Sequence, residues 1–241
     1  FNGTQWLSLT SKKDDKFWGR TDLSYNSTEC NKATASDAAG GDAFGDNVSV
    51  SGDYVIIATS RDDDTAINSG SAYIFKRSGT TWTEEVKLTA SDAAGSDNFG
   101  EMVSIDGDYA IIAAPFDDDD GSGSGSAYIF KRSGTTWMEE AKLTASDAAE
   151  GDLFGYSVSI DGDYVIVGAR QDDDNGNSSG SAYIFKRNGT SWIEEQKLTV
   201  SDAAELDFFG ESVTVNSDFA IIGAIGDDDY GISSGSVYFF D

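Results

Sequence analysis

Residues 99–114 read Phe-Gly-Glu-Met-Val-Ser-Ile-Asp-Gly-Asp-Tyr-Ala-Ile-Ile-Ala-Ala, and this stretch decides the fold because it recurs along the chain. Its leading Phe-Gly pair returns every 55 residues, at Phe44-Gly45, Phe99-Gly100, Phe154-Gly155 and Phe209-Gly210. A second motif, Ser-Ala-Tyr-Ile-Phe in its commonest form, keeps the same spacing at 71–75, 126–130, 181–185 and, with changes, 236–240. A fixed period of this size is typical of repeat proteins, whose units stack on one another.

Each unit reads as four antiparallel β-strands. In the second unit, residues 100–105 alternate like a half-buried strand, whereas residues 109–114 are almost wholly apolar. Between them, Asp106-Gly107 predicts a tight hairpin turn with positive φ at both central positions. Residues 126–132 are the third expected strand and 137–143 the fourth, whose charged side chains predict a solvent-facing outer edge. Such a meander makes one blade, so the predicted fold class is an all-β propeller of four blades.

The first ten residues resemble the last strand of a unit. Asn2-Gly3-Thr4-Gln5-Trp6 matches residues 188–192, and the chain ends at Asp241, where such a strand would begin. We therefore expect residues 1–10 to complete the last blade and close the ring, which would leave no exposed sheet edge. The chain is then a single domain, 1–241, with blades near 44–90, 99–145, 154–200 and 209–241 plus 1–10. Residues 11–33 form an insertion that is either a surface loop, the relic of a decayed blade, or a binding element.

Composition limits the partners. The formal net charge is −27 and histidine is absent. This charge argues against nucleic acid, whose phosphates require lysine and arginine, and favours cations, basic partners or a salty medium. No apolar run approaches the length of a membrane span, so we expect no membrane insertion. Cys30 is the single cysteine, which excludes a disulfide within the chain and leaves the redox compartment undecided.

Two sets of acidic loops are expected on one face of the propeller. Connections in a four-stranded meander alternate between its ends, so the loops between second and third strands share one end with the crossovers between blades. The Lys-Arg pairs at 76–77, 131–132 and 186–187 fall toward the other end. The crossovers carry Asp37, Asp42, Asp92, Asp97, Asp147, Asp152, Asp202 and Asp207. The second–third loops carry Asp62, Asp63, Asp64, Asp117, Asp118, Asp119, Asp172, Asp173, Asp174, Asp227, Asp228 and Asp229.

These twelve aspartates of the second–third loops are the candidate metal ligands. Clustered carboxylates could hold calcium, which takes roughly six to eight oxygen ligands. The alternatives are that the loops are solvated, cap turns through side chain to backbone hydrogen bonds, or keep the protein soluble. No unit shows the spaced Asp-x-Asp-x-Asp-Gly pattern of a dedicated calcium loop.

Catalysis has little support in the sequence. The absence of histidine excludes Ser-His and Cys-His dyads. Paired carboxylates could hydrolyse glycosides, but nothing singles out one pair.

The repeated aromatic residues fit core packing better than sugar stacking. Each motif Phe is expected to pack between blades, while its Gly permits close backbone approach. Glycosylation sequons occur at Asn2, Asn26, Asn47, Asn177 and Asn188.

The motifs Phe-Gly-x-Ser-Val-Ser-Ile, Ala-Ile-Ile-Ala-Ala-Pro (110–115) and Gly-Ser-Ala-Tyr-Ile-Phe resemble the FG-GAP repeat of integrin α-subunit propellers and of many secreted proteins. The resemblance covers 34–241 and the first ten residues. It implies a β-propeller that works in extracellular adhesion, ligand binding or carbohydrate-associated modules, often with calcium. The calcium loop of that family lies between the first two strands, where this chain has only Asp106-Gly107-Asp108 and its equivalents, so the family's ligands have no matching positions here. The family ring commonly has about seven blades.

The sequence thus predicts a non-enzymatic binding or adhesion module, extracellular or on the cell surface. Its acidic loop face, with calcium as a potential cofactor, would recognise a protein or carbohydrate ligand. One alternative is a structural protein that self-assembles into homo-oligomers. A third interpretation, with less support, is a polysaccharide-active enzyme that uses paired aspartates.

Overall fold

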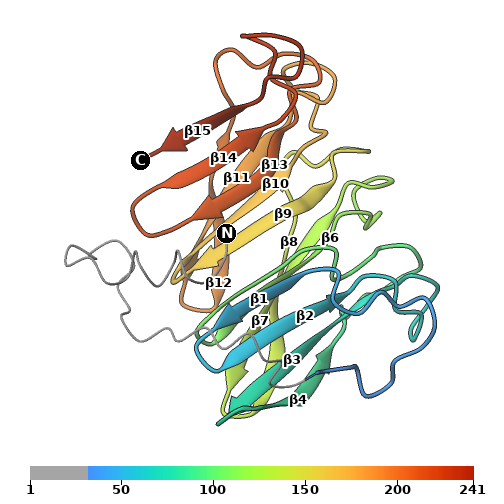
Figure 1. Ribbon diagram of the computed structural model, residues 1–241. Helices are drawn as coiled ribbons and strands as arrows, with labels where there is room; N and C mark the ends of the chain where they lie inside the picture. Colours follow the sequence, from blue (N-terminus) through green and yellow to red (C-terminus); the bar gives the residue numbers. More distant parts are fainter. Residues whose placement is uncertain (1–31) are drawn as a thin grey trace, which may run out of the picture. The chain divides into compact units, whose positions relative to one another are not determined.

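The computed structural model describes residues 32–241 and divides the chain into two units, Phe1–Lys32 and Ala33–Asp241. The second unit contains fifteen strands in four antiparallel sheets (Figure 1). The described residues form no helix. A search of the same residues finds no helical segment with the length and apolar character of a membrane span. The predicted all-β class is therefore confirmed, and the four sheets have the meander order of propeller blades.

Strands follow one another in chain order within every sheet. The first sheet contains β1 (Val48–Ser51), β2 (Tyr54–Thr59), β3 (Ser71–Ser78) and β4 (Thr81–Leu88). The second contains β5 (Val103–Asp106), β6 (Tyr109–Ala114), β7 (Ser126–Ser133) and β8 (Thr136–Leu143). The third contains β9 (Phe154–Asp161), β10 (Tyr164–Ala169), β11 (Ser181–Asn188) and β12 (Ser191–Leu198). The fourth contains β13 (Phe209–Val215), β14 (Ala220–Ala224) and β15 (Ser236–Phe240).

The fourth sheet has three strands among the described residues, because its outer strand would follow β15. The predicted closure of the ring assigns that place to residues 1–10, which lie outside the described residues. The insertion 11–33 lies outside them as well, except for its last two residues. Both expectations stay predictions.

The hairpin turns differ from the expected form by one residue. Asp106 pairs with Tyr109, so the central residues of the turn are Gly107 and Asp108. Gly107 has a φ of 56°, whereas Asp108 is not among the residues with positive φ. The prediction that Asp106-Gly107 forms the turn with two positive φ values was therefore wrong. A single glycine at the first central position suffices, since only that position needs the left-handed region.

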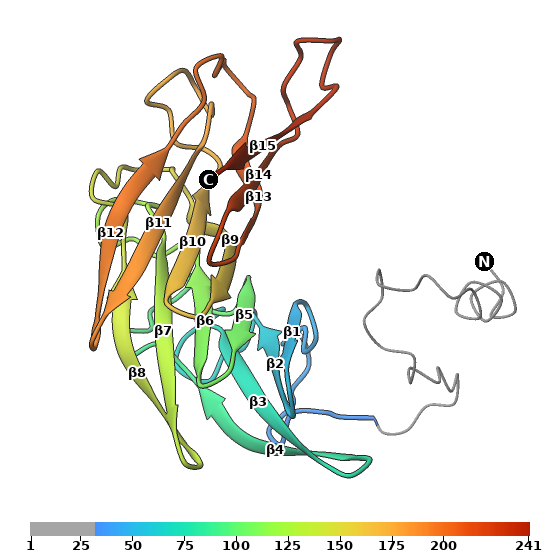
Figure 2. The same cartoon turned by 90° about the vertical axis from the view of Figure 1, so that its left-hand side faces the viewer.

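The apolar core lies between successive sheets. The innermost strands β1, β5, β9 and β13 contact one another in turn (Figure 2). One cluster of buried side chains joins Ile56, Ala72 and Ile74 of the first sheet to Val103 and Ile105 of the second. Equivalent clusters join the second sheet to the third and the third to the fourth. The second and third sheets therefore bury both faces against their two neighbours, which explains why their second strands are almost wholly apolar.

The Phe-Gly motif fastens each blade to the one before it, as the sequence predicts. The fully buried ring of Phe99 packs edge-on against Tyr128 and Phe130, with ring centroids 5.3 and 6.1 Å away. The Phe99 N–H donates to the carbonyl of Ser69 in the preceding blade at 3.0 Å. Gly100 lies so close to the backbone of the preceding blade that an added Cβ would overlap the carbonyl oxygen of Ser71. Only glycine permits this approach.

A backbone ladder continues this contact into the loops. The N–H groups of Ser96 and Asn98, in the crossover to the second blade, donate to the carbonyls of Ile67 and Asn68 at 2.8 and 3.1 Å. The same pattern joins residues 151–154 to 122–124 and residues 206–209 to 177–179. The second–third loop of each of the first three blades is therefore continuous with the crossover that leads into the next blade.

Candidate cation-binding clusters on the acidic loops

The first aspartate of each second–third loop is buried and shapes the loop. In the second blade, Asp117 follows β6, and its N–H donates to the carbonyl of Ala114 at 3.2 Å. One of its carboxylate oxygens accepts the N–H of Asp119 at 3.1 Å, while its own carbonyl accepts the N–H of Gly125 at 2.9 Å. Asp62, Asp172 and Asp227 make the equivalent bonds and are equally buried.

Three aspartates converge on one lysine in the second blade. Lys142, on the outer strand β8, places its ammonium 2.7 Å from Asp92, 3.0 Å from Asp117 and 2.6 Å from Asp119. Tyr128, on β7, has its hydroxyl 2.8 Å from both Asp92 and Asp117 and donates to these carboxylates. The cluster therefore joins the crossover, the second–third loop and the two outer strands of one blade.

The same Asp-Lys-Tyr cluster occurs in the first and third blades. Its members there are Asp37, Asp62, Asp64, Tyr73 and Lys87, and Asp147, Asp172, Asp174, Tyr183 and Lys197. In the fourth blade Tyr238 donates to Asp227 at 2.7 Å, and no described residue supplies the lysine.

Electrostatics favour the charged form of these clusters. The hydrogen bond from Lys87 is the main reason that the pKa of Asp37 falls to about 2. Burial opposes ionisation of Asp92, but the hydrogen bonds from Lys142 and Tyr128 outweigh it, so the pKa of this carboxyl is lowered. Burial likewise opposes the charge on Lys142, yet the three carboxylates raise the pKa of its ammonium above the usual range. The lysine is therefore charged at every physiological pH.

A second group of buried carboxylates forms no ion pair with any residue that the structure describes. Asp97, Asp152 and Asp207, in the crossovers, each accept the backbone N–H of the residue three positions earlier, at 2.7, 2.8 and 2.7 Å. Burial is the main cause that raises the pKa of all three. The pKa of Asp152 reaches about 6, and the nearby charges of Asp172 and Asp173 add to the effect of burial.

The three complete clusters have a donor set that could hold a metal ion. In each, the three aspartates offer carboxylate oxygens that lie within 4.8 Å of one another. The lysine ammonium already lies against these oxygens, however, so a metal would have to displace it. The middle aspartates Asp63, Asp118 and Asp173 do not join the clusters. They are exposed, and Asp63 and Asp118 accept a backbone N–H across the loop at 2.7 and 2.8 Å.

Sequence reasoning missed the lysine and tyrosine of the cluster. Lys87, Lys142 and Lys197 recur every 55 residues, as do Tyr73, Tyr128 and Tyr183, and that recurrence was the available signal. The expected charged outer strand is β8, at the edge of its sheet, and its Lys142 is in addition bonded to three carboxylates. Glu139 on the same strand accepts from the N–H and hydroxyl of Ser91 at 2.9 and 2.8 Å.

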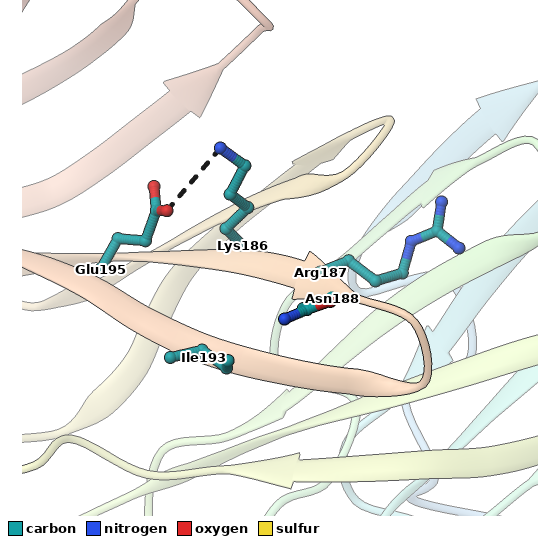
Figure 3. A pocket seen from close by; sticks show the side chains of 5 residues that line it. All are labelled: Lys186, Arg187, Asn188, Ile193 and Glu195. Atoms are coloured by element: carbon teal, nitrogen blue, oxygen red, sulfur yellow. Dashed lines mark ion pairs between the residues drawn. The ribbon is translucent and has the colours of Figure 1, made fainter.

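The basic residues lie at the opposite end of the third strands, as the sequence predicts. Arg132 pairs with Asp108, and its guanidinium lies 4.1 Å from the ring centroid of Tyr54 in the preceding blade. Near this end of the third blade, Lys186, Arg187, Asn188, Ile193 and Glu195 line an open pocket of about 300 Å³ (Figure 3). Lys186 and Glu195 are 3.7 Å apart there. Much of the basic charge at this end of the blades is therefore paired with carboxylates of the protein itself.

The sequons fall in different environments. Asn177 and Asn188 are exposed, whereas Asn47 is half-buried, with its amide nitrogen 3.4 Å from the sulfur of Met102. Asn2 and Asn26 lie outside the described residues.

Stacked four-stranded meanders, fastened by a recurring Phe-Gly pair, define a β-propeller repeat protein. The model of the FG-GAP repeat matches residues 27–75, 82–130, 137–185 and 192–240. These matches cover most of the chain, so the chain belongs to the FG-GAP repeat family. The stretches that start at 82, 137 and 192 begin in an outer strand and end in the third strand of the next sheet, one strand out of phase with the blades. A search of curated proteins found no match.

The calcium loop expected for this family does not fit the first hairpin. Asp106 and Tyr109 pair directly, so the connection contains two residues and offers no set of ligands. A cation site in the second blade must therefore lie outside this hairpin.

We predict that replacing Lys142 with Met destabilises the protein. Asp92, Asp117 and Asp119 would lose their shared cation, and the buried Asp117 would keep an uncompensated charge. Removing one partner of a fully buried ion pair costs about 3–5 kcal/mol. Because Asp92 and Asp119 are largely exposed and screened, we expect about 2–3 kcal/mol. Urea unfolding monitored by tryptophan fluorescence measures this cost.

Lys186→Met is the matched control, because its pair with Glu195 is half-exposed. Its cost should stay below about 1 kcal/mol. Equal costs for the two variants would contradict a structural role of the cluster.

We further predict that Asp152→Asn stabilises the protein at pH 7. Burial raises the folded-state pKa of Asp152 from 3.8 to about 6. The stability that protonated Asp152 contributes to the folded state is therefore fully present below pH 4 and is lost as the pH rises through 6. Asparagine keeps an oxygen for the Ala149 N–H without the charge, so the variant should gain about 1–3 kcal/mol at pH 7 and little at pH 4. Urea titrations from pH 4 to 7 test this, and a difference independent of pH would contradict it.

Proposed function

We propose that this protein is a non-enzymatic binding or adhesion module, extracellular or on the cell surface, whose acidic loop face recognises basic groups of a protein or glycan ligand. The observation that carries the proposal is the fixed geometry of the acidic loops. Backbone hydrogen bonds join the second–third loops of the first three blades to the next crossover, and the N–H of Gly226 joins the start of the fourth loop to the carbonyl of Asp207 in the crossover before it, so the four loops form one continuous row. A preorganised surface loses little conformational entropy on binding.

Within each loop the aspartates differ in role. The first is buried and shapes the loop, and the third joins the lysine cluster in the three complete blades. The middle ones, Asp63, Asp118, Asp173 and Asp228, are exposed. These four carboxylates repeat at the spacing of the blades and are the residues we assign to ligand contact. A single exposed ion pair contributes about 0–1 kcal/mol, so useful affinity requires several loops to bind together.

Several features support a role in binding rather than catalysis. In the three clusters, every converging carboxylate is bonded to lysine, tyrosine or both, so none is placed to transfer a proton to a substrate. The carboxyl with the markedly raised pKa, Asp152, is 5% exposed and bonded to backbone. Exposed Asn177 and Asn188 are accessible to glycosylation in an extracellular setting.

We predict that a lysine-rich peptide binds this face. The triple change Asp63→Asn, Asp118→Asn and Asp173→Asn should weaken binding about tenfold, because three exposed contacts contribute about 0.5 kcal/mol each. Calorimetric titration of the full chain at low and physiological salt measures the effect, and affinity should fall as salt rises. A peptide of the same length with glutamine in place of lysine is the ligand control.

The matched protein control is the triple change Asp53→Asn, Asp108→Asn and Asp163→Asn. It removes the same charge from the opposite end of the blades. It should affect binding much less than the change in the loops. Equal effects would show that net charge alone attracts the peptide, and no binding by the unchanged chain would reject a basic ligand. A panel of neutral and amino sugars tests the glycan class in the same way.

Calcium is a second part of the proposal. A calcium ion at a cluster would have to displace the ammonium from three carboxylates. We therefore expect calcium to raise the melting temperature of the unchanged chain little more than magnesium does. In Lys142→Met the carboxylates are open to a cation, and calcium should stabilise that variant by mass action. Thermal melts in calcium, magnesium and chelator at matched ionic strength measure both. A large calcium-specific rise in the unchanged chain would show that metal replaces the lysine.

A further inference from the structure

Five steps in the described chain place an asparagine or an aspartate directly before a glycine. Glycine has no side chain to shield its backbone nitrogen, so this nitrogen can approach and attack the side-chain carbonyl carbon of the preceding residue. Asparagine reacts in this way more readily than ionised aspartate, because a carboxylate repels a nucleophile. The five steps are Asp106-Gly107, Asp120-Gly121, Asp161-Gly162, Asn175-Gly176 and Asn188-Gly189.

Four of the five glycine N–H groups are held by hydrogen bonds within the protein. Two lie in the hairpins between first and second strands and donate to a side chain of the preceding blade: Gly107 to Ser51 at 3.1 Å and Gly162 to Asp106 at 3.0 Å. Two lie in second–third loops and donate to a carbonyl three residues earlier: Gly121 to Asp118 at 3.2 Å and Gly176 to Asp173 at 3.1 Å. Each bond must open before the glycine nitrogen can attack.

The fifth N–H group, that of Gly189, has no acceptor among the described residues. Gly189 begins the turn between β11 and β12, since Asn188 pairs with Ser191. Its φ is 68°, and a side-chain carbon added to it would meet nothing within 4 Å. Asn188 is exposed at the end of β11 (Figure 3), and no described residue bonds its amide. Both reacting groups are therefore free.

The open turn is a property of the hairpin itself. The hairpins between third and fourth strands of the first two blades, whose following blades are fully described, have the same form. Gly79 and Gly134 have φ values of 64° and 67°, no described acceptor for their N–H groups and nothing within 4 Å of an added side-chain carbon. Ser78 and Ser133 precede them, so the turn does not require asparagine.

We propose that Asn188 is a site of spontaneous modification, where the folded chain converts asparagine into isoaspartate and aspartate. The Gly189 nitrogen attacks Cγ of Asn188, and the bond from Cγ to Nδ2 breaks. Ammonia leaves with the proton of the Gly189 nitrogen, and a cyclic imide (succinimide) remains. Water then opens this ring at either carbonyl. The net reaction consumes one water and releases one ammonia for each asparagine, with no change of oxidation state.

The product changes the basic end of the third blade. It adds a negative charge on the same face of β11 as Lys186, since side chains two residues apart in a strand share a face. In isoaspartate the backbone runs through the side-chain carbon and is one carbon longer, which disturbs the pair of Asn188 with Ser191. The reaction also removes the glycosylation sequon, because the asparagine itself is consumed.

Incubation of the folded full chain at mildly alkaline pH, followed by trypsin digestion and mass spectrometry, tests this inference. Trypsin separates the three Asn-Gly steps of the sequence: Asn188 falls in peptide 188–197, Asn175 in 171–186 and Asn2, outside the described residues, in 1–12. Opening one backbone hydrogen bond slows a reaction about two- to tenfold, so Asn188 should react at least about threefold faster than Asn175. In urea, where that bond is lost, the two rates should become equal.

Two variants test whether the hairpin is the cause. Asn188→Ser restores the residue of the equivalent hairpins, so it should abolish the reaction in peptide 188–197 and leave the melting temperature unchanged. Ser133→Asn transfers the step to the second blade, where Gly134 is equally open. The new site should react within about threefold of the rate at Asn188, because the two turns have the same geometry.

Two results would overturn the inference. Asn188 could react no faster than Asn175 in the folded chain, which would show that the open turn does not promote the attack. Position 133 could stay unreacted in folded Ser133→Asn, which would show that the hairpin holds its glycine nitrogen away from the asparagine.

Discussion

The contact between one ammonium and three carboxylates makes the acidic loops of the first three blades compatible with a compact fold. Without it, like charges from the crossover and the second–third loop would be held within a few ångströms of one another, and buried carboxylates such as Asp117 would have no counter-ion. Repulsion and desolvation would then open the loops. Lys142 removes both costs in the second blade, and Lys87 and Lys197 do so in the first and third.

The same contact links stability to surface chemistry. Because the lysine comes from the outer strand and the aspartates from the loops, the cluster fixes the loops relative to the sheet. The exposed middle aspartates of the loops are then held in place by the rigid loop backbone, although they make no bond to the lysine themselves. A fixed array of like charges at the spacing of the blades is suited to a ligand with several basic groups, and poorly suited to a small substrate that needs one differentiated pocket.

The repeat period made most of the fold predictable from sequence. The apolar stretch 109–114 and the motif at 126–130 became β6 and part of β7, because repeated apolar residues must be buried against neighbouring units. The hairpin at Asp106 was misplaced by one residue, since either neighbour of the glycine could occupy the second central position. The cluster was missed because Lys142 lies 25 residues from Asp117, and only strand pairing brings the third and fourth strands together at that end of the blade. Local charge patterns carry no information on such a contact.

Near-identity of the units has a further physical consequence. Val48, Val50 and Phe239 keep apolar side chains at positions whose equivalents in neighbouring blades are buried, and no charge replaces them. Natural sheets usually protect exposed ends with lysine, proline or bulges. In the first three blades the acidic loops do not oppose this packing, because each of these blades carries its own lysine against its carboxylates.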